Sequence, residues 1–425
     1  MQNMPLAIAI FALTYVLMLA LSKYRKYVAL GAAAVFILTG MLPIGQVLGS
    51  ISWNVIMMIV GTMGIVSLFI DSRMPARMAD LLLGVTPNVK WAVVSLALFA
   101  GIISAFVDNV ATVLMVAPVA MAIAQRLKIN PVPIIISIAV SSNLQGAATL
   151  VGDATAIMLG DYAELTFLDF FAYQGKPGIF FAVELGAVVS ALILLLMFRK
   201  ETAKVPKAEP TAVKDYFPTI LLVGTVLLLI VASFLPNMPE NSNGYICIAM
   251  MFLGLGYTAI TKKSAQAVLK PIKELDFDTI LLLLGLFIVI GGITEQGVIG
   301  ALAEVLSKLG GGNVFLSYTI LVWFSVLISA FVDNIPYVMT MLPVVQTMAF
   351  TMGIDPTPLY FGLLSGATLG GNLTPFGASA NITGIGILRK NGFEVKNADF
   401  FRIGIPFTLA AVIPGYIYIW LMFGV

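Results

Sequence analysis

The chain has 425 residues, of which 60% are hydrophobic and only 10% are charged, and its mean hydropathy is +1.02. This composition excludes a soluble globular domain and requires a lipid environment, so we expect an integral membrane protein. Histidine is absent and Cys247 is the single cysteine, which excludes an internal disulfide and the usual zinc ligands. Motifs of nucleotide or nucleic-acid binding are also missing.

Hydropathy divides the chain into long apolar runs. A helix needs about 20 mostly apolar residues to cross the hydrocarbon layer. The sequence therefore predicts an all-α polytopic membrane protein, and we expect its first run to be retained because no basic segment or cleavage site accompanies it. The ten predicted spans are 5–22, 27–43, 52–70, 131–160, 178–198, 216–235, 243–261, 277–294, 357–388 and 401–424.

Two further apolar stretches, 90–127 and 314–350, carry an acidic residue near their centre. Each is too long for one span and contains the hexapeptide SAFVDN, at 104–109 and at 329–334. A carboxylate at the bilayer centre costs roughly 2.5 to 3.5 kcal/mol, so it marks a functional position. We expect each stretch to be a re-entrant hairpin with its Asp-Asn pair at the tip.

The hexapeptides belong to a longer repeat. Residues 103–158 and 328–383 align without a gap, with 19 identical positions out of 56. We therefore predict a first repeat over 1–200, a linker over 201–215 and a second repeat over 216–425. Each repeat would contain five transmembrane helices and one re-entrant hairpin.

Lysine and arginine collect on one side of this layout. With both termini outside, 21 of the 23 basic residues fall in cytoplasmic segments, including Lys23, Arg25 and Lys26 of the first loop. This asymmetry follows the positive-inside rule, and we expect a prokaryotic inner membrane. Five crossings per repeat invert the second copy relative to the first, so the two hairpins would enter from opposite sides. Inverted repeats of this kind are typical of secondary transporters.

Glycine pairs, Pro375 and closely spaced polar residues interrupt the spans 131–160 and 357–388, so we expect two broken helices near the midplane. Unwound backbone beside a hairpin tip supplies oxygen ligands for Na⁺ or a solute. The Asp-Asn pairs at the tips are the candidates for Na⁺. The predicted substrate- and ion-binding residues are Ser104, Asp108, Asn109, Thr112, Asn143, Gln145, Thr149, Asp153, Ser329, Asp333, Asn334, Asn372, Thr374, Ser379 and Asn381.

Purely structural roles are the alternative for these residues. The Asp-Asn pairs could only cap the half-helices after each tip, and the polar residues of the broken spans could only pack between small residues. Asp153 aligns with Ala378 and Asn372 with Ala147, so we expect two chemically unequal half-sites. Glu184 is a further intramembrane acid whose role the sequence leaves open.

The paired SAFVDN segments, followed by GATLGGNLTPFGASANITGIGIL, resemble the ion transporter superfamily, most closely the branch of arsenite permeases, NhaD-type sodium/proton antiporters and the melanosomal P protein. The resemblance covers nearly the whole chain and is strongest over 323–407. It implies a homodimer whose transport domain, with both hairpins and both broken helices, moves as an elevator. In some arsenite permeases it also implies a soluble ATPase partner. The Ser-Asn-Thr tip motif of the dicarboxylate branch is absent, and Asn- and Asp-rich tips are closer to the arsenite permeases.

We therefore expect a transporter and not an enzyme. The predicted function is ion-coupled secondary transport of a small inorganic solute, most of all arsenite-type export, with H⁺ or Na⁺ as the coupling ion and no other cofactor. Sodium/proton antiport and the transport of an inorganic or carboxylate anion are the alternatives. A passive channel is a weaker alternative that inverted repeats do not exclude. An intramembrane aspartyl protease is weaker still, because the acids recur in duplicate contexts and Gly152-Asp153 lacks the preceding glycine of the GxGD motif. The expected partners are the solute, membrane lipids and a second copy, and no nucleic acid.

Overall fold

The computed structural model describes residues 3–205, 210–235 and 238–424, and these residues are almost entirely helical. Residues 206–209 of the predicted linker 201–215 lie outside the described residues. Short 3-10 helices lie at η1 (Ser22–Tyr24), η2 (Leu168–Phe170) and η3 (Gly371–Leu373), and the strands β1 (Ala172–Tyr173) and β2 (Lys176–Pro177) form an antiparallel pair. The α-helices are α1 (Met4–Ala20), α2 (Arg25–Leu38), α3 (Ile44–Val47), α4 (Trp53–Asp71), α5 (Met74–Gly84), α6 (Val89–Ser104), α7 (Asn109–Leu127), α8 (Val132–Gln145), α9 (Ala154–Tyr162), α10 (Ile179–Met197), α11 (Phe217–Ser233), α12 (Ser242–Lys262), α13 (Ala265–Lys273), α14 (Phe277–Glu295), α15 (Val298–Leu309), α16 (Val314–Ser329), α17 (Asn334–Met352), α18 (Thr357–Gly370), α19 (Ser379–Lys390) and α20 (Asn397–Phe423).

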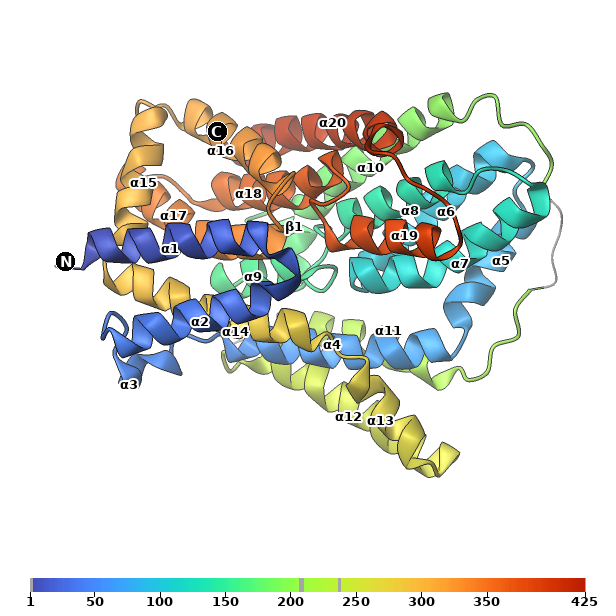
Figure 1. Cartoon of the computed structure of the whole chain (residues 1–425), viewed down its shortest axis with the longest axis horizontal. Helices are drawn as coiled ribbons and strands as arrows, with labels where there is room; N and C mark the ends of the chain where they lie inside the picture. Colours follow the sequence, from blue (N-terminus) through green and yellow to red (C-terminus); the bar gives the residue numbers. More distant parts are fainter. Residues whose placement is uncertain (1–2, 206–209, 236–237, 425) are drawn as a thin grey trace.

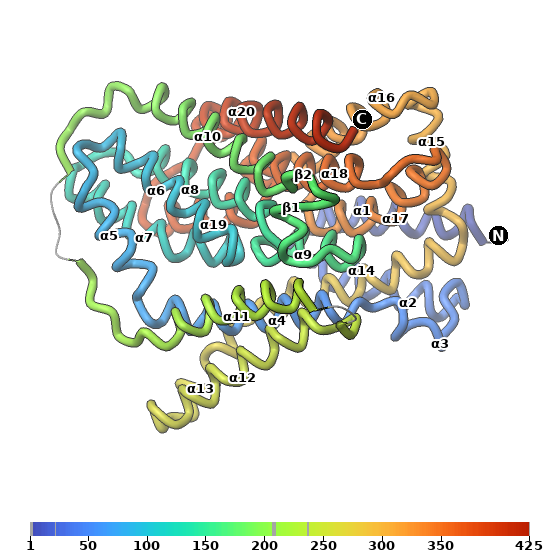
Figure 2. The backbone as a smooth tube through the Cα atoms, turned by 180° about the vertical axis from the view of Figure 1, so that it is seen from behind, coloured from blue at the N-terminus to red at the C-terminus, as the bar shows by residue number. Residues whose placement is uncertain are grey.

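Most of the long helices run along the longest axis of the molecule (Figure 1). Helices α5, α6 and α7 lie at one end of this axis, and α15, α16 and α17 lie at the opposite end, in the front view and in the rear view of Figure 2. The two helical pairs that end and restart at SAFVDN therefore approach each other from opposite ends. Secondary transporters with inverted halves have this arrangement.

Seven helices of the described chain are long and apolar enough to cross a membrane, and an eighth span is possible if α15 and α16, bent by 115°, are taken together. Five of the seven coincide with predicted spans, namely α4, α10, α12, α14 and α20. The other two, α7 and α17, are the second helices of the predicted hairpins. Helices α1 and α11 are apolar but have only 17 residues.

The predicted span 27–43 has the wrong bounds. Helix α2 ends at Leu38, because Gly40 has a positive φ of 70° and Pro43 follows, and the short helix α3 begins only at Ile44. Glycine adopts this left-handed backbone without the steric cost that other residues meet, and proline cannot continue a helix. The apolar residues after Leu38 therefore form a turn.

The two SAFVDN segments and the two broken spans interrupt the helices at matching positions. Helix α6 ends at Ser104 and α7 begins at Asn109, just as α16 ends at Ser329 and α17 begins at Asn334. One helix later, α8 ends at Gln145 before α9 begins, and α18 ends at Gly370 before α19 begins. Each half thus brings two helix breaks together.

One threonine in each half closes a hairpin tip onto the following broken helix. The Thr149 hydroxyl donates to the Ala105 carbonyl, and the Thr374 hydroxyl donates to the Ala330 carbonyl. These two contacts join aligned positions of the repeat. They satisfy backbone carbonyls that have left the helix, which an apolar environment requires.

A glycine beside each threonine permits this close approach. A Cβ at Gly152 would lie 2.7 Å from the Gly146 carbonyl oxygen, and a Cβ at Gly377 would lie 2.7 Å from the Gly371 oxygen and 2.8 Å from the Ala330 oxygen. These distances are too short for carbon and oxygen, and the neighbouring atoms are backbone. Only glycine therefore fits at the two positions.

We predict that Gly152→Ala and Gly377→Ala each destabilise the protein by about 1 to 3 kcal/mol, because the added methyl group separates the hairpin tip from the broken helix. Thermal unfolding of the purified protein in detergent measures the effect. Gly386→Ala in α19 is the matched control, since a Cβ there meets open space. Unfolding temperatures equal to that of the control would contradict the close contact.

Candidate ion- and solute-binding site

Four helices begin where the hairpin tips and the broken helices meet, and aspartates cap three of them. Asp108 accepts hydrogen bonds from the backbone N–H groups of Val110 (3.0 Å) and Ala111 (3.2 Å) at the start of α7. Asp333 accepts from Ile335 N (3.2 Å) at the start of α17, and Asp153 accepts from its neighbour Ala154 N (2.7 Å) at the start of α9. The partial positive charge of each helix N-terminus stabilises these carboxylates.

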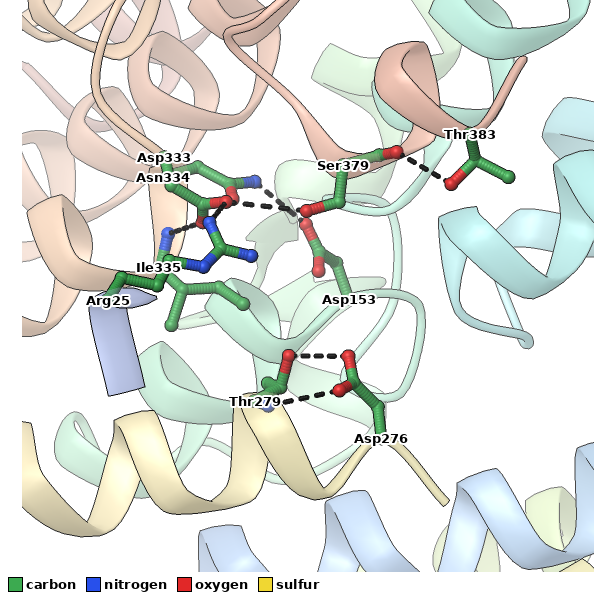
Figure 3. Close-up of polar contacts among 9 residues, drawn as sticks. All are labelled: Arg25, Asp153, Asp276, Thr279, Asp333, Asn334, Ile335, Ser379 and Thr383. Carbon is green, nitrogen blue, oxygen red and sulfur yellow. Dashed lines mark hydrogen bonds and ion pairs between the residues drawn. The ribbon is translucent and has the colours of Figure 1, made fainter. Parts of the chain in front are cut away.

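Asp333 has partners beyond its own helix, so capping is not its only role. The Arg25 guanidinium of α2 lies 2.5 Å from Asp333 Oδ2, and the Ser379 hydroxyl of α19 donates to the same oxygen over 3.3 Å. Figure 3 shows these side chains converging from three helices. The Asp333 side chain is 13% exposed, so it is partly shielded from solvent but accessible.

Asp153 joins the two halves of the chain. It is buried, and its Oδ2 accepts from Asn334 Nδ2 of the second hairpin (3.1 Å) and from the Thr155 hydroxyl (3.2 Å). Figure 3 shows Asp153 facing Asn334 across the site. Asp108 and Asp333 are both close enough to interact with it electrostatically. Tip and broken helix of opposite halves thus share one acidic cluster.

A ladder of buried amides makes a second connection between the halves. Asn109 Nδ2 donates to Asn143 Oδ1 (2.9 Å), and Asn143 Nδ2 donates to the Thr368 carbonyl (2.7 Å) and to Asn372 Oδ1 (3.2 Å). Asn372 Nδ2 continues to the Val140 carbonyl at 2.9 Å. The ladder runs from the first hairpin tip through α8 to the second broken helix. It supplies donors and acceptors without net charge.

The other predicted site residues hold the breaks in place. The Ser142 hydroxyl donates to Ser104 Oγ (3.1 Å), the Ser329 hydroxyl donates to the Ala367 carbonyl (2.5 Å), and the Thr112 hydroxyl donates to the Val107 carbonyl (3.4 Å). Thr149 and Thr374 close the tips as described above. Of the fifteen predicted residues, twelve are buried, and Asp108, Asp333 and Ser379 are partly buried.

Two buried side-chain oxygens of the predicted set have no hydrogen-bond partner within the described residues, Gln145 Oε1 and Asn381 Oδ1. The Asn381 amide nitrogen donates to the carbonyls of Gly371 (3.0 Å) and Thr374 (3.1 Å), so its oxygen is directed elsewhere. Carboxylate, amide and carbonyl oxygens are the ligands that hard cations prefer. Gln145 Oε1 and Asn381 Oδ1 are therefore candidate oxygen ligands for a small cation such as Na⁺. Glu184 of α10, partly buried, lies beside Gln145.

The basic residue of the site, Arg25, is absent from the predicted site residues. The positive-inside pattern places it in a cytoplasmic loop, yet it pairs with Asp333, and the connection between α1 and α2 lies near the middle of the long axis (Figure 1). Asp276, which caps α14 through Thr279, lies below Arg25 and Asp153 in Figure 3 and interacts electrostatically with Arg25. Hydropathy cannot find either residue, because both stand outside the apolar runs.

A large cavity touches one of the broken helices, although none of the fifteen predicted site residues lines it. It has a volume of about 1330 Å³ and reaches Leu150, inside the break between α8 and α9. Its charged lining residues are Asp161, Glu164, Glu240 and Glu295, and none of its lining residues is a lysine or arginine. Asp161 accepts from the Ser52 hydroxyl (2.6 Å) and from Asn54 Nδ2 (2.8 Å), which ties α9 to the start of α4. The cavity therefore favours cations and uncharged solutes over anions.

Comparison with known proteins identifies the family. The citrate transporter family matches residues 15–366. The chain belongs to this family. An uncharacterized transporter of Mycobacterium bovis is 31% identical over 430 residues, 98% of each chain, and a 46 kDa membrane protein of Mycobacterium leprae is 31% identical over 433 residues, again 98% of each. The human P protein is 26% identical over 500 residues, which cover 98% of this chain and 60% of the P protein.

The fold of this citrate transporter family member is similar to that of the YdaH transporter from Alcanivorax borkumensis, with a TM-score of 0.59, 14% identity and coverage of 88% of this chain and 87% of that one. The predicted all-α polytopic fold and the predicted ion transporter superfamily, including the relation to the P protein, are confirmed. The chain is a membrane secondary transporter and performs transport, not catalysis.

We predict that Asn143→Ala destabilises the protein by at least about 2 kcal/mol, because it leaves the buried Asn109 amide and the Thr368 carbonyl without their partner. Thermal unfolding in detergent measures the change. Asn391→Ala is the control, since this exposed side chain makes one bond to its own helix, and we expect an effect within about 0.5 kcal/mol. Equal shifts for the two variants would contradict the ladder.

Proposed function

We propose that the protein is a secondary transporter driven by H⁺ or Na⁺ that exports a small inorganic solute of the arsenite type by elevator-like alternating access, as a homodimer. The observation that carries the proposal is the contact of Asn334 with Asp153, which unites a hairpin tip of one half with a broken helix of the other. A site shared by two halves can open to either face when one part moves.

The carboxylates are the proposed carriers of the coupling ion. Asp153 interacts electrostatically with Asp108 and Asp333, and within the described chain only Asp333 of the three contacts a guanidinium, that of Arg25, so the site has more acidic than basic groups. Unpaired charge in an apolar interior is expensive, and uptake of a proton or Na⁺ reduces this cost. An occupied site can therefore cross the membrane more easily than an empty one.

The amide ladder is the proposed contact for the solute. An uncharged hydroxyl-bearing solute, such as arsenous acid, needs both donors and acceptors, and the buried asparagines, now paired with one another, would offer both by exchanging a bond of the ladder for one to the solute. The acid-lined cavity at the broken helix admits such a solute without a charge penalty. Binding of the solute through its hydroxyl groups requires no cysteine thiolate.

Two specific observations favour other cargoes. The four carboxylates of the cavity and the three of the site favour sodium/proton antiport, with both cations competing for the aspartates. The family description and the Arg25 guanidinium favour a carboxylate anion such as citrate. The flux experiment below separates these cargoes by offering each gradient by itself.

We predict that the double variant Asp108→Asn, Asp333→Asn and the single variant Asp153→Asn lower coupled flux in proteoliposomes at least about tenfold, because the amides cannot bind the coupling ion. Flux is measured for arsenite, Na⁺/H⁺ exchange and citrate, each under an imposed pH or Na⁺ gradient. Glu304→Gln, in an exposed pair with Lys308 on α15, is the control that keeps full flux.

Undiminished coupled flux in the double variant would reject the assigned roles. Single-channel currents in place of saturable flux would favour a channel. If the wild type transports citrate and not arsenite, the substrate is a carboxylate anion, and the proposed ion coupling is unaffected.

A further inference from the structure

The ion pair between Arg25 and Asp333 connects two parts of the chain that are otherwise anchored differently. Arg25 is the first residue of α2, whereas Asp333 caps α17 of the second hairpin, and their side chains meet at 2.5 Å. Helix α2 packs along α14, and Lys26 pairs with Asp278 of α14 at 2.5 Å. Arg25 thus reaches from a helix fixed on α14 to the tip of the hairpin (Figure 3).

Arg25 is the one basic side chain that contacts the candidate site in the described part of the chain. The acidic groups around the pair are Asp276 and Asp278 of α14, Asp153 before α9 and Asp108 before α7, and the nearby phenols are those of Tyr15 and Tyr337. Lys26, the neighbouring cation, is turned toward Asp278. No second cation therefore replaces Arg25 if it withdraws.

The same oxygen of Asp333 cannot serve Arg25 and a coupling cation together. Oδ2 already accepts from the Arg25 guanidinium at 2.5 Å and from the Ser379 hydroxyl at 3.3 Å. A Na⁺ ion on that carboxylate would stand next to the guanidinium, and like charges in a weakly polarisable interior repel strongly. A proton would instead neutralise the carboxylate and so remove the charge that holds the guanidinium in place. Binding of the cation therefore requires Arg25 to move away, and the withdrawal of Arg25 leaves Asp333 open for a cation.

We propose that Arg25 is the resident counter-ion of Asp333, which competes directly with the coupling cation, so that cation binding releases the second hairpin from α2. This inference rests on the proposed function, in which Asp333 binds the coupling ion. The inference assigns to Arg25 the control over when the second hairpin can move.

The exchange of partners explains how occupancy and motion are coupled. Without a bound cation, the second hairpin stays bonded to α2 through Arg25. The transporter therefore does not change its orientation while the ion site is empty. The Tyr15 hydroxyl of α1, bonded to the Pro336 carbonyl at 2.7 Å, is a second link between the first two helices and α17, but it involves no charge that a cation can neutralise. Cation uptake at Asp333 therefore acts on the Arg25 link alone.

Cation binding to the purified full-length protein tests the inference. Thermal unfolding is followed while Na⁺ replaces choline at constant ionic strength, and again while pH is varied in choline alone, because a ligand that binds only the folded state raises its stability. The variants are Arg25→Gln, Arg25→Lys, Asp333→Asn and the matched control Lys26→Gln, which removes the adjacent cation and its pair with Asp278.

For Arg25→Gln we expect the half-saturating concentration of Na⁺, or of protons in the Na⁺-free series, to fall at least about tenfold, because a charge-assisted pair no longer opposes the cation. Arg25→Lys keeps the charge without the planar geometry, so its half-saturating concentration should lie between those of the wild type and Arg25→Gln. Lys26→Gln should match the wild type, and Asp333→Asn should lose the part of the response that Asp333 provides, while Asp108 and Asp153 keep theirs. If Arg25→Gln does not fold, the comparison of Arg25→Lys with the wild type carries the test.

The outcomes separate this inference from the proposed function. Titrations of Arg25→Gln and Arg25→Lys that coincide with the wild type, while Asp333→Asn has lost part of its response, overturn the competition and leave Asp333 as an ion site. A full response in Asp333→Asn shows that Asp333 binds no coupling ion, so the proposed role and the inference fail together. In proteoliposomes, Arg25→Gln should also let solute leave without counter-transport, and strictly coupled flux in that variant would contradict the release step.

Discussion

A helix that breaks inside an apolar layer frees backbone groups that lipid cannot satisfy, and the architecture around the site follows from this constraint. Among the described residues, four helix breaks meet around the site, two at hairpin tips and two in broken helices, and in each half the tip and the broken helix supply hydrogen-bond partners to each other. A threonine hydroxyl binds a tip carbonyl at Ala105 and again at Ala330, and a glycine beside each threonine permits the contact. The broken helices are stable because each break supplies the hydrogen-bond partners that its neighbour lacks.

The negative charges of the site are stabilised both by helix N-termini and by an ion pair. The three aspartates sit at helix N-termini, where backbone N–H groups bind their oxygens. That interaction lowers the cost of burying a carboxylate but leaves an excess of negative charge, which Arg25 only partly neutralises. In the proposed mechanism this excess of negative charge is what a coupling cation would neutralise.

The two halves of the site are related but not equivalent. The tip contacts recur at aligned positions, whereas Asp153 has no counterpart because Ala378 stands at the aligned position before α19. Arg25 likewise approaches only the second tip. The half-sites are therefore unequal: the amide ladder connects both halves, whereas the ion pair with Arg25 involves the second hairpin alone.

Local patterns in the sequence determined much of this protein. Hydropathy predicted most of the helices, the repeated hexapeptide predicted the matching breaks, and the scarcity of charge within apolar runs singled out Asp108, Asp153 and Asp333, because the cost of a buried carboxylate is a local property. The bounds of α2 were misjudged, since apolar residues also continue through the turn at Gly40. Only the tertiary structure decided the pairing of Asn334 with Asp153 and of Arg25 with Asp333, residues 181 and 308 positions apart. Such contacts depend on how helices pack in three dimensions, and a basic residue in a loop has the same sequence signal whether it faces water or a binding site.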